Sequence, residues 1–297
     1  MLKESYSRKF ELEMEKYFFT KMSGAGNDFI LFDSKINPKL ELTPEKIAQI
    51  CNRRTGIGAD GVLVLEPANE VAFGMKYFNA DGYSGSLCAN GSRCSLLYAA
   101  ETGLASSSGI SFLFNSRRYT GEVLADGRVK FNLLPPSLIK LNFKVKFAGQ
   151  LVNASFADTG SPHVVIRIED VLRNPAELKS GFSSIDDFPV FELGKEIRYH
   201  KDFAPDGTNV NFVQVVDGLV KIRTYERGVE DETLSCGTGS VASAVVLYRN
   251  GLINKPVKLS AKSGDQLVVD FEFDGQNFDD VSLTGPAKVV FNGEITI

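Results

Sequence analysis

Two cysteines of the chain stand in segments that resemble one another. One segment reads Cys88-Ala89-Asn90-Gly91-Ser92, and the other reads Cys236-Gly237-Thr238-Gly239-Ser240. Each is followed by an apolar stretch with helical spacing that ends at a glycine. Positions 88 and 236 lie 148 residues apart in a chain of 297, about half its length. An internal duplication, with one cysteine at the start of a helix in each half, is the simplest explanation.

A thiol at the start of a helix can act as an acid or a base, because the helix dipole and the free N–H groups there stabilise a thiolate. One such cysteine alone is more often a small buried residue, but a matched pair favours a shared reaction. Racemisation of an amino acid needs two such groups. One removes the α-proton from one face of the carbon, and the other returns a proton to the opposite face. The two helix N-termini would also bind the α-carboxylate and stabilise the developing charge.

The elements that must position these cysteines are mostly strands. Short alternating or apolar runs bounded by Gly, Asn, Asp or Pro recur along the chain. Helical patterns are few, and the clearest besides the two after the cysteines begins with Thr43 as N-cap and Pro44 at the first helical position. We therefore expect an α+β fold of two pseudo-symmetric halves. Each half is a curved mixed or antiparallel, barrel-like sheet around a central helix, with the active site in the cleft between them. We expect one half to comprise residues 1–134 and 285–297 and the other 135–284, with the junction near Pro135-Pro136.

Other motifs point away from common chemistries. The segment 56–61 (GIGADG) matches GxGxxG, but a helix pattern precedes it and a strand follows, so we expect a structural turn rather than a dinucleotide site. The segment 237–242 opens a helix and is expected to bind an anion such as a carboxylate. The Cys and His spacings fit no metal site, and no G-x-S-x-G elbow occurs. We expect no metal site.

Composition narrows the class of protein further. Lys and Arg total 33, Asp and Glu total 37, and the net charge is −4, which argues against nucleic acid or an anionic membrane as partner. No apolar run approaches the ~18 residues of a transmembrane helix, and the charged N-terminus lacks the apolar core of a secretory signal. Four cysteines are too few for a disulfide scaffold, so we expect a cytoplasmic protein. Cys51 and Cys94 are interpreted as structural.

Further motifs occur in a fixed order along the chain. They are KMSGAGNDF at 21–29, NRR at 52–54 before GIGADG at 56–61, FNADG at 78–82, CANGSRC at 88–94, GSPH at 160–163, NVNF at 209–212, YERG at 225–228 and ETLSCGTG at 232–239. In these motifs the chain resembles the diaminopimelate epimerase family from Tyr17 onward. The resemblance implies a cofactor-independent, two-base epimerase that interconverts LL- and meso-2,6-diaminopimelate, with no cofactor, a small amino acid as substrate, and a homodimer.

The resemblance also implies roles for individual residues. Cys88 and Cys236 would be the thiolate and the thiol, exchanging roles with the direction of reaction. His163 and Glu226 would support the proton state of these thiols and contact the substrate. The residues implied to bind substrate are Asn27, Asn79, Ala89, Asn90, Gly91, Ser161, Asn209, Glu226, Arg227, Gly237 and Thr238.

The sequence departs from the family's pattern at a few positions. Ala89 stands where the family usually has Gly, and Ser161 stands where it often has Asn. Gly61 stands where some members carry a Gln that contacts substrate, and the segment 83–87 is less acidic than usual. The alternatives are therefore another racemase of the same fold, acting on a histidine-type or proline-type substrate, and a non-catalytic amino-acid-binding protein.

Overall fold

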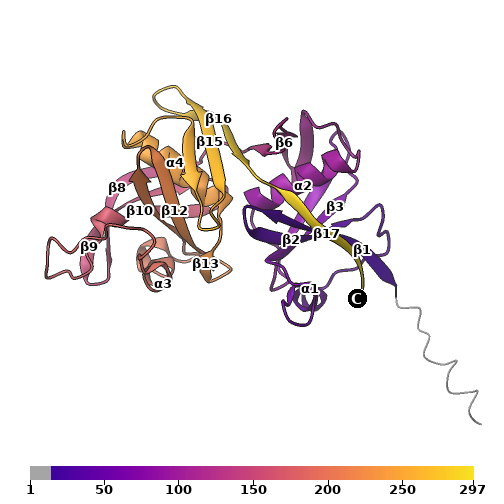
Figure 1. Ribbon diagram of the computed structural model, residues 1–297, viewed down its shortest axis with the longest axis horizontal. Helices are drawn as coiled ribbons and strands as arrows, with labels where there is room; N and C mark the ends of the chain where they lie inside the picture. Colours follow the sequence, from indigo (N-terminus) through magenta and orange to yellow (C-terminus); the bar gives the residue numbers. More distant parts are fainter. Residues whose placement is uncertain (1–14) are drawn as a thin grey trace, which may run out of the picture.

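The protein is described by a computed structural model that covers residues 15–297 and has two lobes (Figure 1). The first lobe contains β1 (Lys16–Gly24), β2 (Asn27–Asp33), α1 (Pro44–Cys51), β3 (Gly61–Glu66), β4 (Phe73–Asn79), α2 (Ala89–Glu101), β5 (Ile110–Phe114), β6 (Arg117–Val123) and β7 (Val129–Asn132). The second lobe contains β8 (Leu138–Phe147), β9 (Gln150–Asp158), β10 (Pro162–Arg167), η1 (Ile168–Asp170), α3 (Val190–Arg198), η2 (Lys201–Phe203), β11 (Asn209–Val216), β12 (Leu219–Glu226), β13 (Asp231–Thr233), α4 (Gly237–Arg249), β14 (Val257–Ser260), β15 (Gln266–Phe273) and β16 (Phe278–Gly285). The last strand, β17 (Lys288–Thr296), returns to the first lobe and pairs with β1.

The two lobes repeat one strand topology. In the first, successive pairings from β1 to β7 are antiparallel, parallel, antiparallel, parallel, antiparallel and antiparallel. The series β9, β10, β11, β12, β14, β15, β16 shows the same order of pairings in the second. The antiparallel strands β17 and β8 flank the two series in the same place. The predicted α+β fold with two pseudo-symmetric halves is confirmed.

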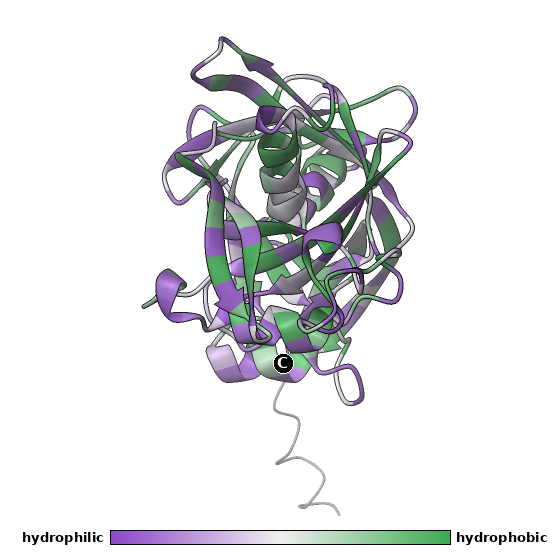
Figure 2. Ribbon diagram, turned by 90° about the vertical axis from the view of Figure 1, so that its left-hand side faces the viewer, coloured by the Kyte–Doolittle hydropathy of each residue, from purple (hydrophilic) through white to green (hydrophobic). Residues whose placement is uncertain are grey.

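Each sheet curves around one central helix. The helix α2 packs against strands of the first lobe, and α4 packs against strands of the second. Both helices are buried nearly all round, with only the last residues near solvent. A helix that is covered on every side needs small and apolar residues on every face, which explains the Ala, Ser, Gly and Val content of both. Strands alternate between apolar and polar residues along their length, with apolar residues gathered around the helices (Figure 2).

One shorter helix covers the outside of each sheet. In the first lobe α1 begins as predicted, with Pro44 at the first helical position and the Thr43 hydroxyl accepting a hydrogen bond from the Lys46 N–H. In the second lobe α3 packs on β11 and β12. The segment 56–61 is the turn between α1 and β3, with its glycine at 56 too close to the carbonyl oxygen of Gln49 to admit a side chain. The prediction of a structural turn there is confirmed.

The lobes are joined through strands. The strand β7 pairs with β16 of the second lobe, so equivalent strands of the two repeats meet. Pro135-Pro136 lies in the segment between β7 and β8. Within residues 15–297, no helix is both long and apolar enough to cross a membrane. The expectation that the N-terminal segment is not a secretory signal concerns chiefly residues 1–14, which lie outside the described residues.

Candidate active site

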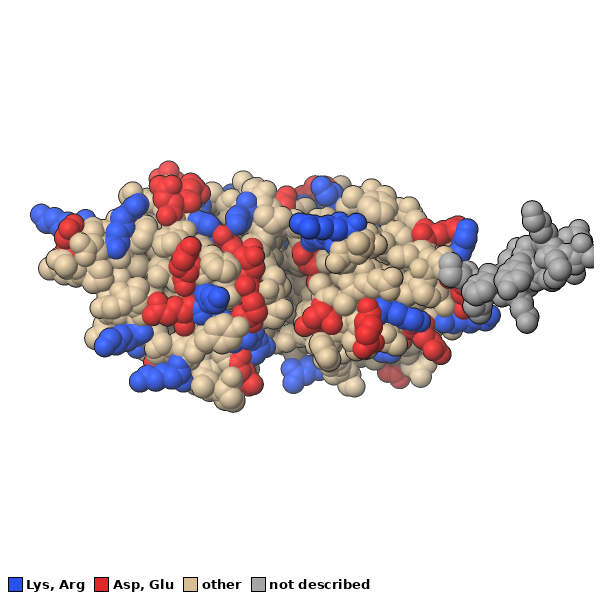
Figure 3. Space-filling model, turned by 90° about the horizontal axis from the view of Figure 1, so that it is seen from below, with Lys and Arg blue, Asp and Glu red and all other residues tan. Residues whose placement is uncertain are grey.

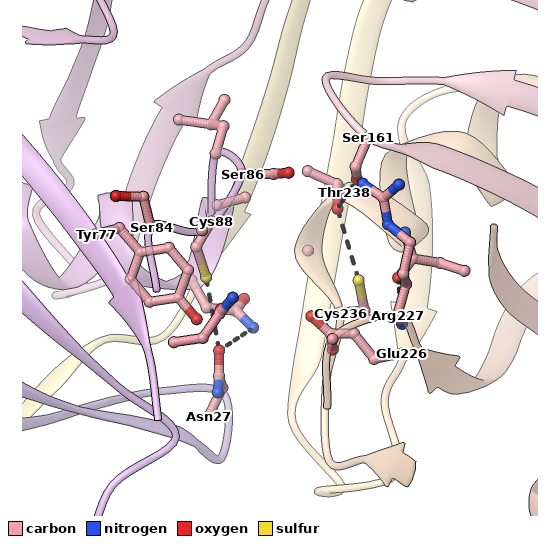
Figure 4. A pocket seen from close by; sticks show the side chains of 18 of the residues that line it. Asn27, Tyr77, Ser84, Ser86, Cys88, Ser161, Glu226, Arg227, Cys236 and Thr238 are labelled. Carbon is pink, nitrogen blue, oxygen red and sulfur yellow. Dashed lines mark hydrogen bonds between the residues drawn. The ribbon is translucent and has the colours of Figure 1, made fainter. Parts of the chain in front are cut away.

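A cavity of about 260 Å³ lies between the two lobes. Figure 3 shows the surface hollowed along this junction, with acidic and basic side chains interspersed on the lobes beside it. Both cysteines, the first residues of α2 and α4, and the ends of several strands form its walls (Figure 4). Of the residues predicted for the site, those that line the cavity are Asn27, Asn79, Cys88, Ala89, Asn90, Ser161, Asn209, Glu226, Arg227, Cys236, Gly237 and Thr238.

Cys88 is the N-cap residue of α2. Its backbone is extended, and its sulfur accepts a hydrogen bond from the Gly91 N–H at 3.4 Å. Its thiol points at Oδ1 of Asn27, 3.7 Å away. Gly91 itself does not line the cavity, so its N–H serves the cysteine rather than a bound molecule.

Amide side chains hold the Cys88 side of the cavity. Asn27 follows a two-residue hairpin turn in which Ala25 and Gly26 both have positive φ, a conformation that favours a glycine. Its Nδ2 donates to Asp60 Oδ2 at 2.6 Å, which turns Oδ1 toward the thiol. Asn90 donates to the Ser235 carbonyl at 2.9 Å and thereby ties the start of α2 to the other lobe.

A buried arginine fixes the orientation of Asn90. The Arg93 side chain is fully buried, and its guanidinium donates to Asn90 Oδ1 at 2.8 Å and to the Ala89 carbonyl at 3.3 Å. Burial lowers its pKa to about 10, so it remains positively charged at neutral pH. Its charge favours a thiolate at Cys88.

Cys236 is the N-cap residue of α4, and its surroundings differ. Its sulfur lies 3.6 Å from the Thr238 hydroxyl, and this hydroxyl lies 2.9 Å from Nε2 of His163. The Asn211 amide donates to Nδ1 of His163 at 3.1 Å, while its other proton goes to the Val164 carbonyl at 3.0 Å. Because Nδ1 accepts, the neutral imidazole carries its proton on Nε2. The Thr238 hydroxyl can therefore accept from His163 and donate to Cys236.

Burial sets the proton states of these groups. It raises the pKa of the Cys88 thiol to about 12 and that of Cys236 well above its usual value, outweighing the backbone N–H groups that favour the thiolates. It lowers the pKa of His163 to about 3, with a smaller contribution from the Arg227 charge, so the imidazole is neutral. Both thiols are therefore protonated at neutral pH. The helix N-terminus alone does not produce the thiolate that its sequence position suggests.

Glu226 is the group in the cavity whose pKa lies near neutral pH. Burial raises its pKa to about 7, and the Thr233 hydroxyl donates to its Oε2 at 2.9 Å. When it is ionised, its negative charge raises the pKa of both cysteines. A carboxyl group that is half ionised near pH 7 and close to both thiols can take up the proton that either releases.

Polar residues at the ends of strands form the far side of the cavity. Arg227 follows β12, and its backbone N–H donates to Asn209 Oδ1 at 2.9 Å. Asn209 Nδ2 donates to the Pro162 carbonyl at 2.9 Å, which joins the ends of β10, β11 and β12. Figure 4 shows the Arg227 guanidinium beside Ser161. This end of the cavity can bind a carboxylate, because guanidinium donors match its geometry.

The N-termini of the two central helices meet at the cavity. A Cβ built on Gly237 would lie 2.8 Å from the methyl group of Ala89 and 3.1 Å from Asn90 Oδ1. The first N–H groups of both helices have no intrahelical partner. They converge from opposite lobes, so an anion at this point would meet two helix dipoles of the same sign.

Sequence reasoning missed several groups. Tyr77, Ser84, Ser86 and Arg198 also line the cavity, while Arg93 and Asn211 lie behind its walls. Tyr77 could have been found, because it lies two residues before Asn79 on a strand and so shares its face. Arg198 reaches the cavity from α3, far away in sequence, and no local pattern marks it. Two predicted site residues, Gly91 and His163, do not line the cavity, and His163 lies behind Thr238, with its Nε2 2.9 Å from the Thr238 hydroxyl.

The fold is shared with solved isomerase structures. A probable proline racemase from Agrobacterium radiobacter superposes with a TM-score of 0.71 at 13% identity, covering 95% of this chain and 93% of that one. A hydroxyproline epimerase from Agrobacterium vitis superposes with a TM-score of 0.68 at 14% identity, with coverage of 95% and 93%. At such identities the likeness concerns the fold: two sheet-wrapped helices facing one cleft.

Sequence comparison gives the family. The model of the diaminopimelate epimerase family matches residues 19–139 and 155–290. The diaminopimelate epimerase of Chlorobaculum tepidum is 39% identical over 280 residues, which is 93% of this chain and 100% of the relative. That of Aquifex aeolicus is 38% identical over 290 residues, 94% and 97% of the two chains. The chain belongs to the diaminopimelate epimerase family, a family of isomerases.

Proposed function

We propose that the chain interconverts LL- and meso-2,6-diaminopimelate, with Cys88 and Cys236 as its two acid–base groups. The observation that carries this proposal is the pair of matched helix N-caps that face one cavity from opposite lobes. Family membership supplies the substrate. Inversion without a cofactor requires two acid–base groups on opposite sides of one carbon, and two thiols that face one cavity can supply them.

In this mechanism, substrate binding is coupled to release of one thiol proton to Glu226. The resulting thiolate takes the α-proton, and the electron pair of the C–H bond moves into the carboxylate. The thiol of the opposite lobe then gives its proton to the other face of the carbon, so that the two cysteines end with exchanged proton states. The α-carboxylate lies between the N-termini of α2 and α4, where N–H groups stabilise the added charge.

The far end of the substrate is bound by the strand ends. Arg227 pairs with the distal carboxylate, and Asn79, Ser161 and Asn209 hold the distal amino-acid group together with it. Ser161 has a shorter side chain than the Asn common at this position. It lies 2.9 Å from Nε2 of His163 and 3.3 Å from the Thr238 hydroxyl, which links the distal end to the Cys236 side.

Incubation with LL-diaminopimelate in deuterated water tests this function. We expect meso product with one α-deuterium, and each of Cys88→Ser and Cys236→Ser should lower the rate by about 100-fold or more. Cys51→Ala is the matched control, because Cys51 is buried and does not line the cavity. Deuterium in proline or histidine instead of diaminopimelate would indicate another racemase. Full turnover by both serine variants would contradict the two-base mechanism.

We further propose a cytoplasmic homodimer. Phe18 on β1, with Val290 and Phe291 on β17, exposes about half of each side chain and gives the first lobe an apolar edge. All four cysteines are free thiols, which suits a reducing compartment. Light scattering that gives twice the chain mass of 32.5 kDa would support the dimer, and a single chain mass would refute it.

We also keep the division into residues 1–134 with 285–297, and 135–284, as a proposal. It is supported by the repeated strand order, in which β17 pairs with β1 of the first lobe. Residues 135–284 are co-expressed with a chain in which residues 1–134 are joined to residues 285–297 by a flexible linker, and recovery of a bound, active pair is the expected result, whereas two parts that do not associate would contradict the division.

A further inference from the structure

Tyr77 brings an unused phenol to the wall of the cavity. It lies on β4, two residues before Asn79, and lines the cavity beside Cys88. Its hydroxyl makes no hydrogen bond to any other residue in the described part of the chain. Only the hydroxyls of Ser235 and Ser243 are buried without a partner there, so that of Tyr77 is open to the cavity. Figure 4 shows it on the same side as Cys88 and Asn27.

The Tyr77 ring lies between two glycines, Gly61 and Gly85. A Cβ on Gly61 would lie 2.7 Å from the ring edge and 3.2 Å from the hydroxyl oxygen. A Cβ on Gly85 would lie 2.4 Å from the opposite ring edge. Phe29 meets the ring edge-on at 6.0 Å between centroids. A Cβ on Gly61 would also lie 2.5 Å from the Phe78 carbonyl oxygen, so the backbone as well as the ring requires a glycine there, whereas the atoms nearest to a Cβ on Gly85 belong to the Tyr77 ring.

The contacts of the substrate leave one group for this hydroxyl, an argument that rests on the proposed function. The α-carboxylate goes to the two helix N-termini, the α-proton lies on the axis between the sulfurs, and the rest of the molecule extends to Arg227. The α-amino group is the remaining substituent of the reacting carbon. We propose that the Tyr77 hydroxyl hydrogen-bonds this α-amino group and positions the reacting carbon between Cys88 and Cys236.

The electrostatics of this wall suit a positively charged group. Burial raises the pKa of Tyr77 well above its usual value, and the carboxylates of Glu226 and Asp60 raise it further. The hydroxyl therefore stays protonated and neutral, and its oxygen offers lone pairs to an ammonium group. The same negative charges attract that ammonium group.

The test compares ligands that differ at the reacting centre. In both isomers of the substrate the distal centre is L, so D-2-aminopimelate places its amino group at the reacting carbon. Pimelate has the same two carboxylates and no amino group. Inhibition constants of both are measured on the wild type, on Tyr77→Phe and on Tyr83→Phe, whose side chain is 66% exposed. Tyr77→Phe keeps the ring and removes only the hydroxyl.

For Tyr77→Phe we expect the inhibition constant of D-2-aminopimelate to rise about 5- to 20-fold and that of pimelate to change less than twofold, as one lost hydrogen bond predicts. Tyr83→Phe should change neither. An unchanged constant for D-2-aminopimelate, or an equal change for both ligands, would overturn the role of Tyr77. Wild-type protein that does not epimerise LL-diaminopimelate would overturn the proposed function instead, which separates the two failures.

Discussion

The two N-cap cysteines have the same extended backbone conformation, but their side chains have different surroundings. Cys88 faces the Asn27 amide and is backed by the charged Arg93, whereas Cys236 faces the Thr238 hydroxyl and is backed by the neutral His163. The two repeats therefore place the cysteines in equivalent positions and surround each thiol with different polar groups. In the proposed mechanism, the two proton transfers at one carbon are chemically alike but are influenced by different neighbours.

The same contrast holds one step away from the caps. Gly61 opens β3 opposite Asn79, and Asn209 opens β11 in the equivalent place beside Glu226. In the second lobe an asparagine fills the position with its own side chain. In the first lobe the glycine leaves room for the Tyr77 ring. The departure at Gly61 that the sequence shows is therefore matched by Tyr77, the residue directly before the FNADG motif at 78–82, whose ring lies beside the glycine.

The largest expected effect comes from the group that both caps share. Glu226→Gln should lower kcat/KM by about 100-fold or more, because neither thiol can then pass its proton to a carboxylate. In the wild type kcat/KM should rise between pH 6 and 8 as a carboxyl with a pKa of about 7 ionises. The variant should lack this rise, as a pH–rate series would show.

The stability of the folded protein should fall over the pH range in which kcat/KM rises. The Glu226 carboxyl ionises near its usual 4.5 in the unfolded chain and near about 7 in the folded protein. The folded state therefore binds more protons in this window, and stability falls as pH rises through it. Glu226→Gln should raise the melting temperature relative to wild type at pH 8 but not at pH 4. The exposed Glu192→Gln is the control, and an equal shift at both pH values would contradict the assignment.

The second effect should be confined to the Cys236 cap. Thr238→Val should lower kcat/KM by about 10- to 100-fold, the value of a hydrogen bond to a charged sulfur, and Thr238→Ser should restore most of it. Because the equilibrium constant is fixed, the loss in kcat/KM must be equal in both directions. A difference between the caps can therefore appear in kcat and in KM taken separately, while their ratio falls equally in both directions.

The comparison with His163→Gln sharpens this point. With a pKa of about 3, His163 is neutral over the whole working range, so its removal should lower activity and leave the rise near pH 7 intact. If His163→Gln abolished that rise, the imidazole and not Glu226 would be the titrating group.

The sequence predicted what depends on local pattern. The repeat of a cysteine, small residues and a helix predicted both N-caps, and Thr43-Pro44 predicted the start of α1. Long-range placement was out of reach. Arg198 reaches the cavity from α3, and no spacing in the chain marks it. Asn211 and Arg93 lie inside the motifs at 209–212 and 88–94, but only the packed structure shows that Asn211 contacts His163 and that Arg93 is fully buried against Asn90. The proton states were also out of reach, because burial opposes the helix dipole and only the packed structure shows which effect is larger.

A third effect should come from the point where the two helices touch. The methyl group of Ala89 faces Gly237 where the two helices meet at the cavity. Gly237→Ala would place a second methyl 2.8 Å from the first and 3.0 Å from Leu283, which should cost about 1–3 kcal/mol of stability and about tenfold in activity. Chemical denaturation and initial rates measure both.

Exchange of the two residues tests whether the Ala89 methyl group is what excludes a side chain at position 237. Ala89→Gly alone should change stability and activity little. Ala89→Gly combined with Gly237→Ala should recover part of the stability and activity that Gly237→Ala loses, since Leu283 still limits the space. A double variant no better than Gly237→Ala would show that the methyl of Ala89 is not the obstacle.

The smallest effect concerns the outer helices, where the lobes also differ. The helix α1 has a side-chain cap from Thr43, whereas Pro189, at the start of α3, has no side-chain acceptor. Thr43→Ala should therefore lower the free energy of unfolding by about 1 kcal/mol. Since α1 lies outside the sheet, kcat/KM should stay within about twofold. The exposed Thr55→Ala removes a hydroxyl that caps nothing and should change stability by less than about 0.5 kcal/mol. Equal losses in both threonine variants would mean that the cap contributes nothing and that the contrast between α1 and α3 is only geometric.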